Sequence, residues 1–150
     1  MSTSLDATWS DILDVARKLG RNAFVASVDE QARPHLAIVW LVIVQDVFHF
    51  VSDRSAVKAR NLAARPAVTA HFQVVEEGPN EGEQLFLRGV ASLAEVPARR
   101  RELWDSGAWG DLGQWYSGPN DPTLAFIRVD ATEASITAGF GASGRRAWRI

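Results

Sequence analysis

A candidate phosphate-binding segment lies between residues 48 and 62, where a strand pattern leads directly into a basic helix pattern. Alternating side chains over residues 48–52 predict a strand, and Ser55 is predicted to cap a helix that ends near Ala64. The free N–H groups of a first helical turn and the helix dipole favour an anion. Four basic residues accompany this helix, namely Arg54, Lys58, Arg60 and Arg65. The segment therefore predicts a phosphate site, and a solvated basic helix is the alternative interpretation.

The spacing along this helix separates two of its basic residues. Lys58 and Asn61 are three residues apart and share one face. Arg60 is turned by about 200 degrees from Lys58, because each residue adds about 100 degrees. We therefore expect Lys58 to serve the phosphate. For Arg60 a tail phosphate, a carboxylate and a partner subunit remain open.

The rest of the chain must position this segment, and its patterns are mostly those of strands. Helices are predicted over residues 6–19, 55–64 and 97–105, with Asp6 as the first cap and Gly20 as the first stop. Strand patterns cover residues 23–28, 35–44, 47–52, 67–75, 84–93, 124–137 and 145–150. Residues 35–44 are almost wholly apolar, which predicts a long strand buried on both faces.

These elements favour a mostly β fold. Six to seven strands interrupted by three short helices predict an antiparallel barrel with helical insertions. A short break at residues 45–46 and exposed loops at 76–83 and 139–144 are expected to join strands. The glycines of the last loop spell a dinucleotide-binding pattern, but no long helix fits in the few residues after it.

Composition excludes several classes of protein. The 150 residues are 47% hydrophobic and 23% charged, which suits one soluble domain over residues 1–150. The longest apolar run is too short to cross a bilayer, and no export signal opens the chain, so a cytoplasmic location without membrane partners is expected. The net charge of -2 argues against a general nucleic-acid binder. The absence of cysteine excludes a thiolate metal site, and the three histidines lack a metal-ligand spacing.

Several short motifs, in order, carry a resemblance to a known family. They are Arg33-Pro34-His35, Ile38-Val39-Trp40, Phe50-Val51-Ser52, Lys58-Ala59-Arg60-Asn61-Leu62 and Arg65-Pro66-Ala67-Val68. In these the chain resembles the split-barrel flavin and deazaflavin oxidoreductases, which include the pyridoxamine 5'-phosphate oxidases and general stress proteins. The resemblance covers nearly the whole chain and implies the FMN-binding split barrel fold.

The resemblance also implies a homodimer with two cofactors in clefts between the subunits. The cofactor would be a deazaflavin coenzyme (F-420 type) or FMN, with phosphate on Ser52, Ser55 and Lys58. Backbone groups of Ile38, Val39 and Val51 would line the ring. The remaining candidate contacts are Trp40, Arg60, Asn61 and, from the neighbouring subunit, Trp148. Trp40 would equally serve as barrel core.

The implied function is an oxidoreductase that transfers hydride between a reduced deazaflavin or flavin and a small organic acceptor. A non-catalytic carrier or storage protein for the cofactor is the alternative. Val57 and Val51 replace an arginine and a tyrosine of the vitamin oxidases, which argues against their activity. An acidic deazaflavin tail is expected to gain from three arginines, namely Arg54, Arg60 and Arg65. The expected dimer-interface aromatics are Trp104, Trp109 and Trp115.

Overall fold

The computed structural model describes residues 3–4, 6–73, 82–139 and 144–150. The helices are α1 (Trp9–Leu19), α2 (Val57–Ala64) and α3 (Pro97–Asp105), with the 3₁₀ turn η1 (Leu112–Gln114). The strands are β1 (Thr3–Ser4), β2 (Asn22–Val28), β3 (Pro34–Trp40), β4 (Val42–Val44), β5 (Val47–Asp53), β6 (Ala67–Gln73), β7 (Gln84–Leu93), β8 (Leu124–Thr137) and β9 (Arg145–Arg149). Within these ranges, no helix has the length and apolar character needed to cross a bilayer.

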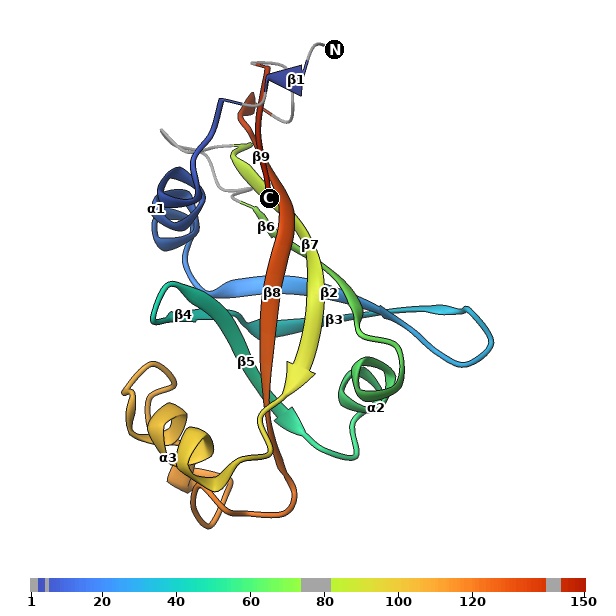
Figure 1. The fold of residues 1–150 in the computed structure, drawn as a ribbon, viewed down its shortest axis with the longest axis vertical. Coiled ribbons are helices and arrows are strands. Elements are labelled where there is room, and N and C mark those ends of the chain that lie inside the picture. The colour runs from blue at the N-terminus through green and yellow to red at the C-terminus, as the bar shows by residue number, and fades with distance from the viewer. Residues whose placement is uncertain (1–2, 5, 74–81, 140–143) are drawn as a thin grey trace.

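The strands form one strongly curled sheet (Figure 1) with the path β1-β9-β8-β7-β6-β2-β3. The hairpin of β4 and β5 joins this path through β5, which pairs with β8. Among the described pairings only the short one between β1 and β9 is parallel. The predicted fold class, a mostly β antiparallel split barrel with helical insertions, is confirmed.

The predicted single strand over residues 35–44 is wrong, because the chain changes partner at Leu41. The Leu41 amide donates to the Arg21 carbonyl at 2.7 Å. Before this point β3 pairs with β2, and after it β4 pairs with β5. The strand is also not buried on both faces, since Leu36 and Ile38 are each 63% exposed. An apolar outer face that the chain itself leaves uncovered has the same sequence pattern as a doubly buried strand.

The helix starts differ from their predicted caps. Thr8, and not Asp6, caps α1, in a reciprocal capping box with Asp11. Gly20 ends this helix as expected, at φ 88°. Helix α2 begins after Ala56 with no side-chain cap, so the prediction that Ser55 caps it is wrong. The chain instead closes a turn in which the Ala56 amide donates to the Asp53 carbonyl at 3.0 Å.

Two apolar cores support the fold. The main core fills the curled sheet beneath α1 and α2, and a second packs α3 and η1 against β4 and β8. Trp109 belongs to the second core at 1% exposure, and its Nε1 donates to the Leu103 carbonyl at 2.9 Å. The prediction of Trp109 as an interface aromatic is therefore wrong. Trp104 is half-buried and Trp115 is exposed.

The turns that join the strands are partly within the described ranges. Gln45 and Asp46 both have positive φ, 51° and 63°, and form the tight turn of the β4–β5 hairpin. Most of the two loops predicted at 76–83 and 139–144 lies outside the described residues.

Candidate cofactor site

Two hydrogen bonds fix α2 to the end of β2. The Asn61 amide donates to the Ser27 hydroxyl across 3.2 Å, and both side chains are buried. Arg65 Nε, just after the helix, donates to the Val28 carbonyl at 2.9 Å. Buried polar groups that are hydrogen-bonded tolerate little displacement, so these contacts determine where the start of α2 lies.

The start of α2 offers free hydrogen-bond donors. No side chain caps the helix, and its first N–H groups therefore lack the acceptor that a capping residue supplies. Lys58 in the first turn is half-buried, and Ser55 before it is exposed. Backbone N–H groups, a hydroxyl and an ammonium group form a donor set that fits a phosphate.

The basic cluster around α2 is smaller than predicted. Arg54 Nη1 pairs with Glu95 Oε1 at 2.8 Å, and Arg65 is held on the Val28 carbonyl. The prediction that four basic residues together face an anion is therefore wrong. Of the four basic residues, Lys58 and Arg60 are the two that make no side-chain hydrogen bond or ion pair with another residue in the described ranges. Arg60 alone thus remains of the three arginines expected to bind an acidic tail.

The end of β5 lies against α2 and carries two of the predicted site residues. Ser52 is buried, and its hydroxyl donates to the Asp53 carbonyl at 2.9 Å. Val51 is half-buried against the second core and pairs with Phe126 of β8. The structure therefore brings Ser52 to the corner where α2, β3 and the end of β5 meet, but its hydroxyl is turned toward the backbone.

A tyrosine attaches the segment after α3 to the same corner. The Tyr116 hydroxyl donates to Asp53 Oδ1 at 2.9 Å. Partial burial, followed by the bond to Asp53, raises the pKa of Tyr116 to about 12. Tyr116 therefore stays protonated at neutral pH, and its hydroxyl hydrogen is donated to Asp53.

Strand β3 supplies an apolar wall beside α2. Ile38 points outward, and Trp40 is 41% exposed with the Arg21 guanidinium 3.8 Å from its ring centroid. The Val39 side chain is buried, so only its backbone can contact a ligand outside the sheet. Since β3 ends the strand path, one edge of its backbone faces away from β2. An exposed apolar face with a free backbone edge fits a flat ring.

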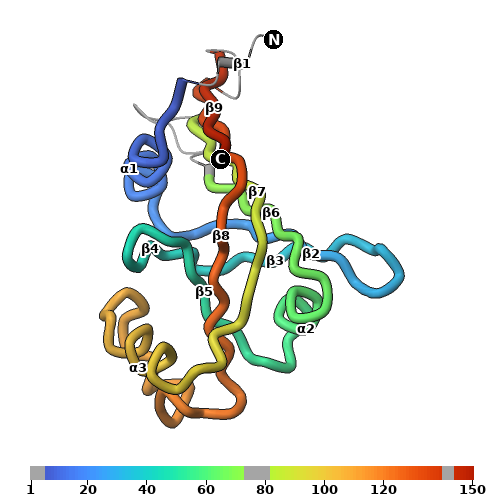
Figure 2. Tube along the Cα trace, viewed as in Figure 1, coloured from blue at the N-terminus to red at the C-terminus, as the bar shows by residue number. Residues whose placement is uncertain are grey.

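Trp148 lies away from this corner within one chain. Its ring packs on Trp9 of α1 at 4.6 Å between centroids. Figures 1 and 2 show β9 and α1 at one end of the molecule, and α2 toward the other. In one chain, therefore, α2, β3 and β5 are neighbours and Trp148 is not near them. These three elements carry the other predicted site residues, namely Ile38, Val39, Trp40, Val51, Ser52, Lys58, Arg60 and Asn61, with Ser55 just before α2.

An apolar groove of about 530 Å³ crosses the outer face of the sheet next to β3. Phe24, Leu36, His71 and Phe86 line it, and His71 Nε2 lies 3.0 Å from Gln84 Oε1. The sequence analysis missed this groove because its residues come from four strands. Their alternation signals outward positions, but only the register shows that they are neighbours.

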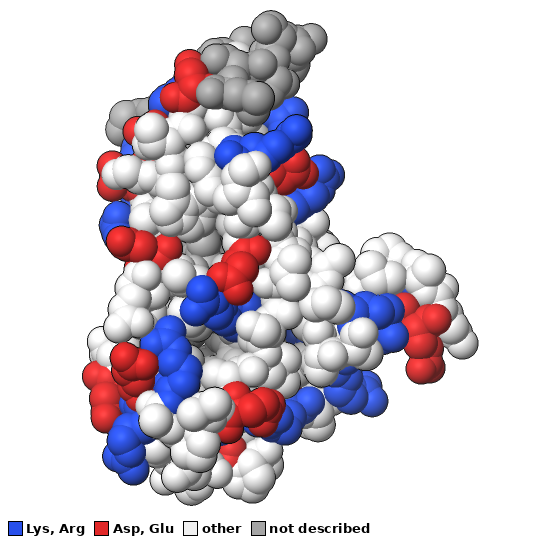
Figure 3. All heavy atoms as spheres, viewed as in Figure 1, with Lys and Arg blue, Asp and Glu red and all other residues white. Residues whose placement is uncertain are grey.

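The surface charges are mixed. On the face shown in Figure 3, acidic and basic side chains are interspersed, and no broad basic area appears. Together with the net charge of -2, this pattern agrees with a small-molecule site better than with a nucleic-acid surface.

A comparison of the sequence with protein families matches residues 17–138 to the pyridoxamine 5'-phosphate oxidase family. A comparison with curated proteins found no match. The fold is shared with solved structures of low sequence identity. General Stress Protein 26 from Bacillus anthracis str. Sterne is 19% identical with a TM-score of 0.64, and the alignment covers 84% of this chain and 91% of that one.

Two further structures extend this likeness. A nimC/nimA family protein from Clostridium acetobutylicum has a TM-score of 0.74 at 12% identity, with 95% of this chain and 94% of that chain covered. A heme binding protein from Mycobacterium smegmatis has a TM-score of 0.73 at 12% identity, and 95% of this chain covers 58% of that longer one. These likenesses establish the arrangement of the strands.

Proposed function

Since the chain belongs to the pyridoxamine 5'-phosphate oxidase family, we propose that it is an oxidoreductase that binds a deazaflavin coenzyme of the F-420 type or FMN at the corner of α2 and β3. The family includes flavin-binding oxidoreductases. The observation that carries the proposal is the uncapped start of α2 with Lys58 in its first turn. That donor set fits the phosphate that both cofactors share.

The residues of this chain bind and orient the cofactor. Lys58, Ser55 and the first N–H groups of α2 hold the phosphate, and Asn61 acts indirectly by fixing the helix on Ser27. Ile38 and Trp40 exclude water from one side of the ring. When bound, the cofactor supplies the hydride, and a small organic acceptor receives it.

The site is completed by a second copy of the chain. The outer face of β3 leaves Leu36, Ile38 and Trp40 exposed, and Leu36 also lines the apolar groove. Large exposed apolar surface of this kind marks an interaction face. A homodimer that covers it converts the open wall into a cleft, and residues of the other subunit, with Trp148 as a candidate, close the cofactor in.

Titration of FMN and of the deazaflavin, each followed by fluorescence, tests the cofactor assignment. Lys58→Ala is expected to weaken binding by about 1.5 to 3 kcal/mol, the range for a hydrogen bond to a charged group. Arg101→Ala is the matched control, because Arg101 is an exposed cation on α3. Equal affinities for wild type and Lys58→Ala, with unchanged thermal stability, would leave α2 as a solvated helix.

Turnover separates the enzyme from the carrier. The enzyme is expected to reoxidise its reduced cofactor faster when an organic acceptor is added, as followed by cofactor absorbance. If the protein binds the cofactor tightly and no acceptor changes the rate at which the bound cofactor is reoxidised, the protein is a carrier.

A further inference from the structure

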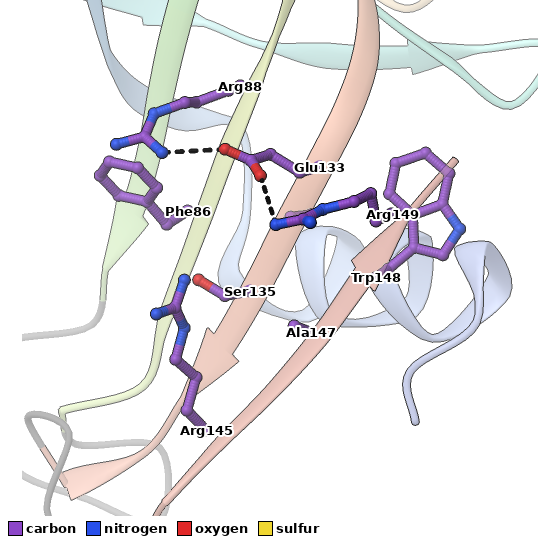
Figure 4. Close-up of a pocket in the computed structure, with 9 residues that line it drawn as sticks. Phe86, Arg88, Glu133, Ser135, Arg145, Ala147, Trp148 and Arg149 are labelled. Atoms are coloured by element: carbon purple, nitrogen blue, oxygen red, sulfur yellow. Dashed lines mark hydrogen bonds and ion pairs between the residues drawn. The ribbon is translucent and has the colours of Figure 1, made fainter. Parts of the chain in front are cut away.

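A second pocket, of about 280 Å³, opens on the outer face of β7, β8 and β9 (Figure 4). Arg88, Glu133, Ser135, Arg145 and Arg149 line its polar side, and Phe86 lines its apolar side. None of these residues belongs to the corner of α2 and β3. Their charges and their position relative to the groove indicate what the pocket binds.

The pocket carries an excess of positive charge. Glu133 Oε1 accepts from Arg88 Nη1 at 2.8 Å, and its Oε2 accepts from Arg149 Nη2 at 3.2 Å. The bond from Arg88 is the main reason why the pKa of Glu133 is lowered, so this carboxylate is ionised at neutral pH. Among the described residues that line the pocket, three guanidinium groups thus face one carboxylate, which is a net charge of +2.

The guanidinium groups also have donors to spare. Each has five N–H groups, and Arg88 and Arg149 each use one on Glu133. Figure 4 shows the Arg145 side chain extending toward Ser135, on the same side of the strands as Arg88. A planar guanidinium with free paired N–H groups matches the two oxygens of a carboxylate.

The cationic pocket adjoins the apolar groove through Phe86, which lines both. The register places Phe24, His71, Phe86 and Ser135 in one row across β2, β6, β7 and β8. Strands in a sheet lie about 4.8 Å apart, so the row spans roughly 14 Å. The two cavities together form one surface, apolar toward the cofactor corner and cationic at the far end.

We propose that this pocket binds the carboxylate of an organic acid whose flat apolar body lies in the groove. That this acid is the acceptor of the reaction rests on the proposed function; that the pocket binds it does not. The groove then holds the reactive part of the acceptor between the cofactor corner and the arginines. Neutral molecules of the same shape bind poorly, because they leave the excess charge uncompensated.

Binding to the full chain without cofactor tests the pocket independently of turnover. The probes are trans-cinnamate and its neutral counterpart trans-cinnamamide, titrated calorimetrically at low salt. Cinnamate is expected to bind roughly tenfold or more tightly than the amide, the ratio for one added charged hydrogen bond. Equal affinities, or no binding of either probe to wild type, would overturn the proposal.

Variants locate the site of binding. Arg145→Gln is expected to weaken cinnamate roughly tenfold and to leave the amide unchanged, whereas Phe86→Ala weakens both probes. Arg101→Gln is the control outside the pocket and should match wild type. Cinnamate affinity that survives both Arg145→Gln and Arg149→Gln would contradict the assignment. Thermal unfolding of each variant verifies that it is folded.

The same variants separate this inference from the proposed function. Arg145→Gln should leave the affinity for FMN and for the deazaflavin unchanged, because the proposed phosphate and ring contacts lie on α2 and β3, and the Trp148 ring packs on Trp9, away from Arg145 (Figure 4). Arginine-dependent cinnamate binding without cofactor binding would refute the proposed function and retain the pocket. Cofactor binding without any preference for cinnamate would do the reverse.

Discussion

The Asn61 amide donates to the Ser27 hydroxyl across 3.2 Å, in the buried contact between α2 and β2. This single bond links the helix whose first turn we propose to bind phosphate to a strand that borders the apolar groove. Its effect on cofactor binding is indirect, because neither side chain is exposed.

Removing one partner of this bond should destabilise the fold. Asn61→Ala and Ser27→Ala each leave a buried polar group unsatisfied, which costs about 1 to 3 kcal/mol. Urea unfolding measures the free energy of unfolding of each single variant and of the double variant. The double variant should be less destabilised than the sum of the singles, and strict additivity would show that the bond is not energetically coupled.

The outer face of β3 should control the dimer. Ile38→Lys puts a charge on a face that we propose to be buried twice, once per subunit. Loss of two isoleucine burials is worth about 3 kcal/mol or more, which raises the dimer dissociation constant by roughly a hundredfold. Sedimentation measures this shift. Ile150→Lys is the control, because Ile150 is 83% exposed. A wild-type protein that is monomeric at micromolar concentration would contradict the proposed dimer.

The stability of the protein should depend on pH through His49. This histidine is fully buried, its Nδ1 lies 3.0 Å from the Val47 carbonyl, and its Nε2 lies 3.3 Å from Arg99. Burial is the main cause that lowers its pKa to about 4, and the nearby charges of Arg99 and Arg128 lower it further. As the pH falls from 6.5 toward 4, His49 becomes protonated in the unfolded chain but stays neutral in the folded protein. The free energy of unfolding therefore decreases in that pH window.

A His49→Gln variant isolates this effect. Between pH 7 and pH 5 the wild type should lose about 2 kcal/mol more than the variant, because the variant cannot take up the proton. Denaturant unfolding at both pH values gives the difference. Parallel pH profiles would mean that the imidazole has the same pKa in the native protein as in the unfolded chain.

A close backbone approach at Gly89 should make this position intolerant of a side chain. An ideal Cβ at Gly89 would lie 2.8 Å from the carbonyl carbon of Asp130 and 2.9 Å from Cα of Ala131. Both are backbone atoms next to the register shift between β7 and β8. We expect Gly89→Ala to cost about 2 to 3 kcal/mol, and Gly118→Ala, with no atom within 4 Å, to cost much less. Thermal melting compares the two.

The sequence predicted elements whose periodicity is local. Strand β8 occupies the predicted residues 124–137, because this segment contains no glycine or proline that would interrupt a strand. Gly20 ended its helix where expected, since only the local backbone decides a positive φ. The fold class follows from such local patterns and from their order.

Choices between distant partners were not predictable in the same way. Arg54 pairs with Glu95, 41 residues away, and no local pattern indicates that the Arg54 guanidinium is engaged in an ion pair. The bend at Leu41 depends on which strands β3 and β4 pair with, and Trp109 is buried by a core that assembles from separate elements. The helix α2 was therefore predicted, but the residue that caps it and the charge around its start were not.

Strand β3 has consequences for the single chain, before the dimer that we propose can form. It ends the sheet path and presents Leu36 and Ile38 to solvent, a combination that invites edge-to-edge pairing and aggregation. Association would protect the newly made chain by occupying this edge. Because such protection follows mass action, the midpoint of thermal unfolding should rise with protein concentration, and dilution should favour proteolysis of the separated chains.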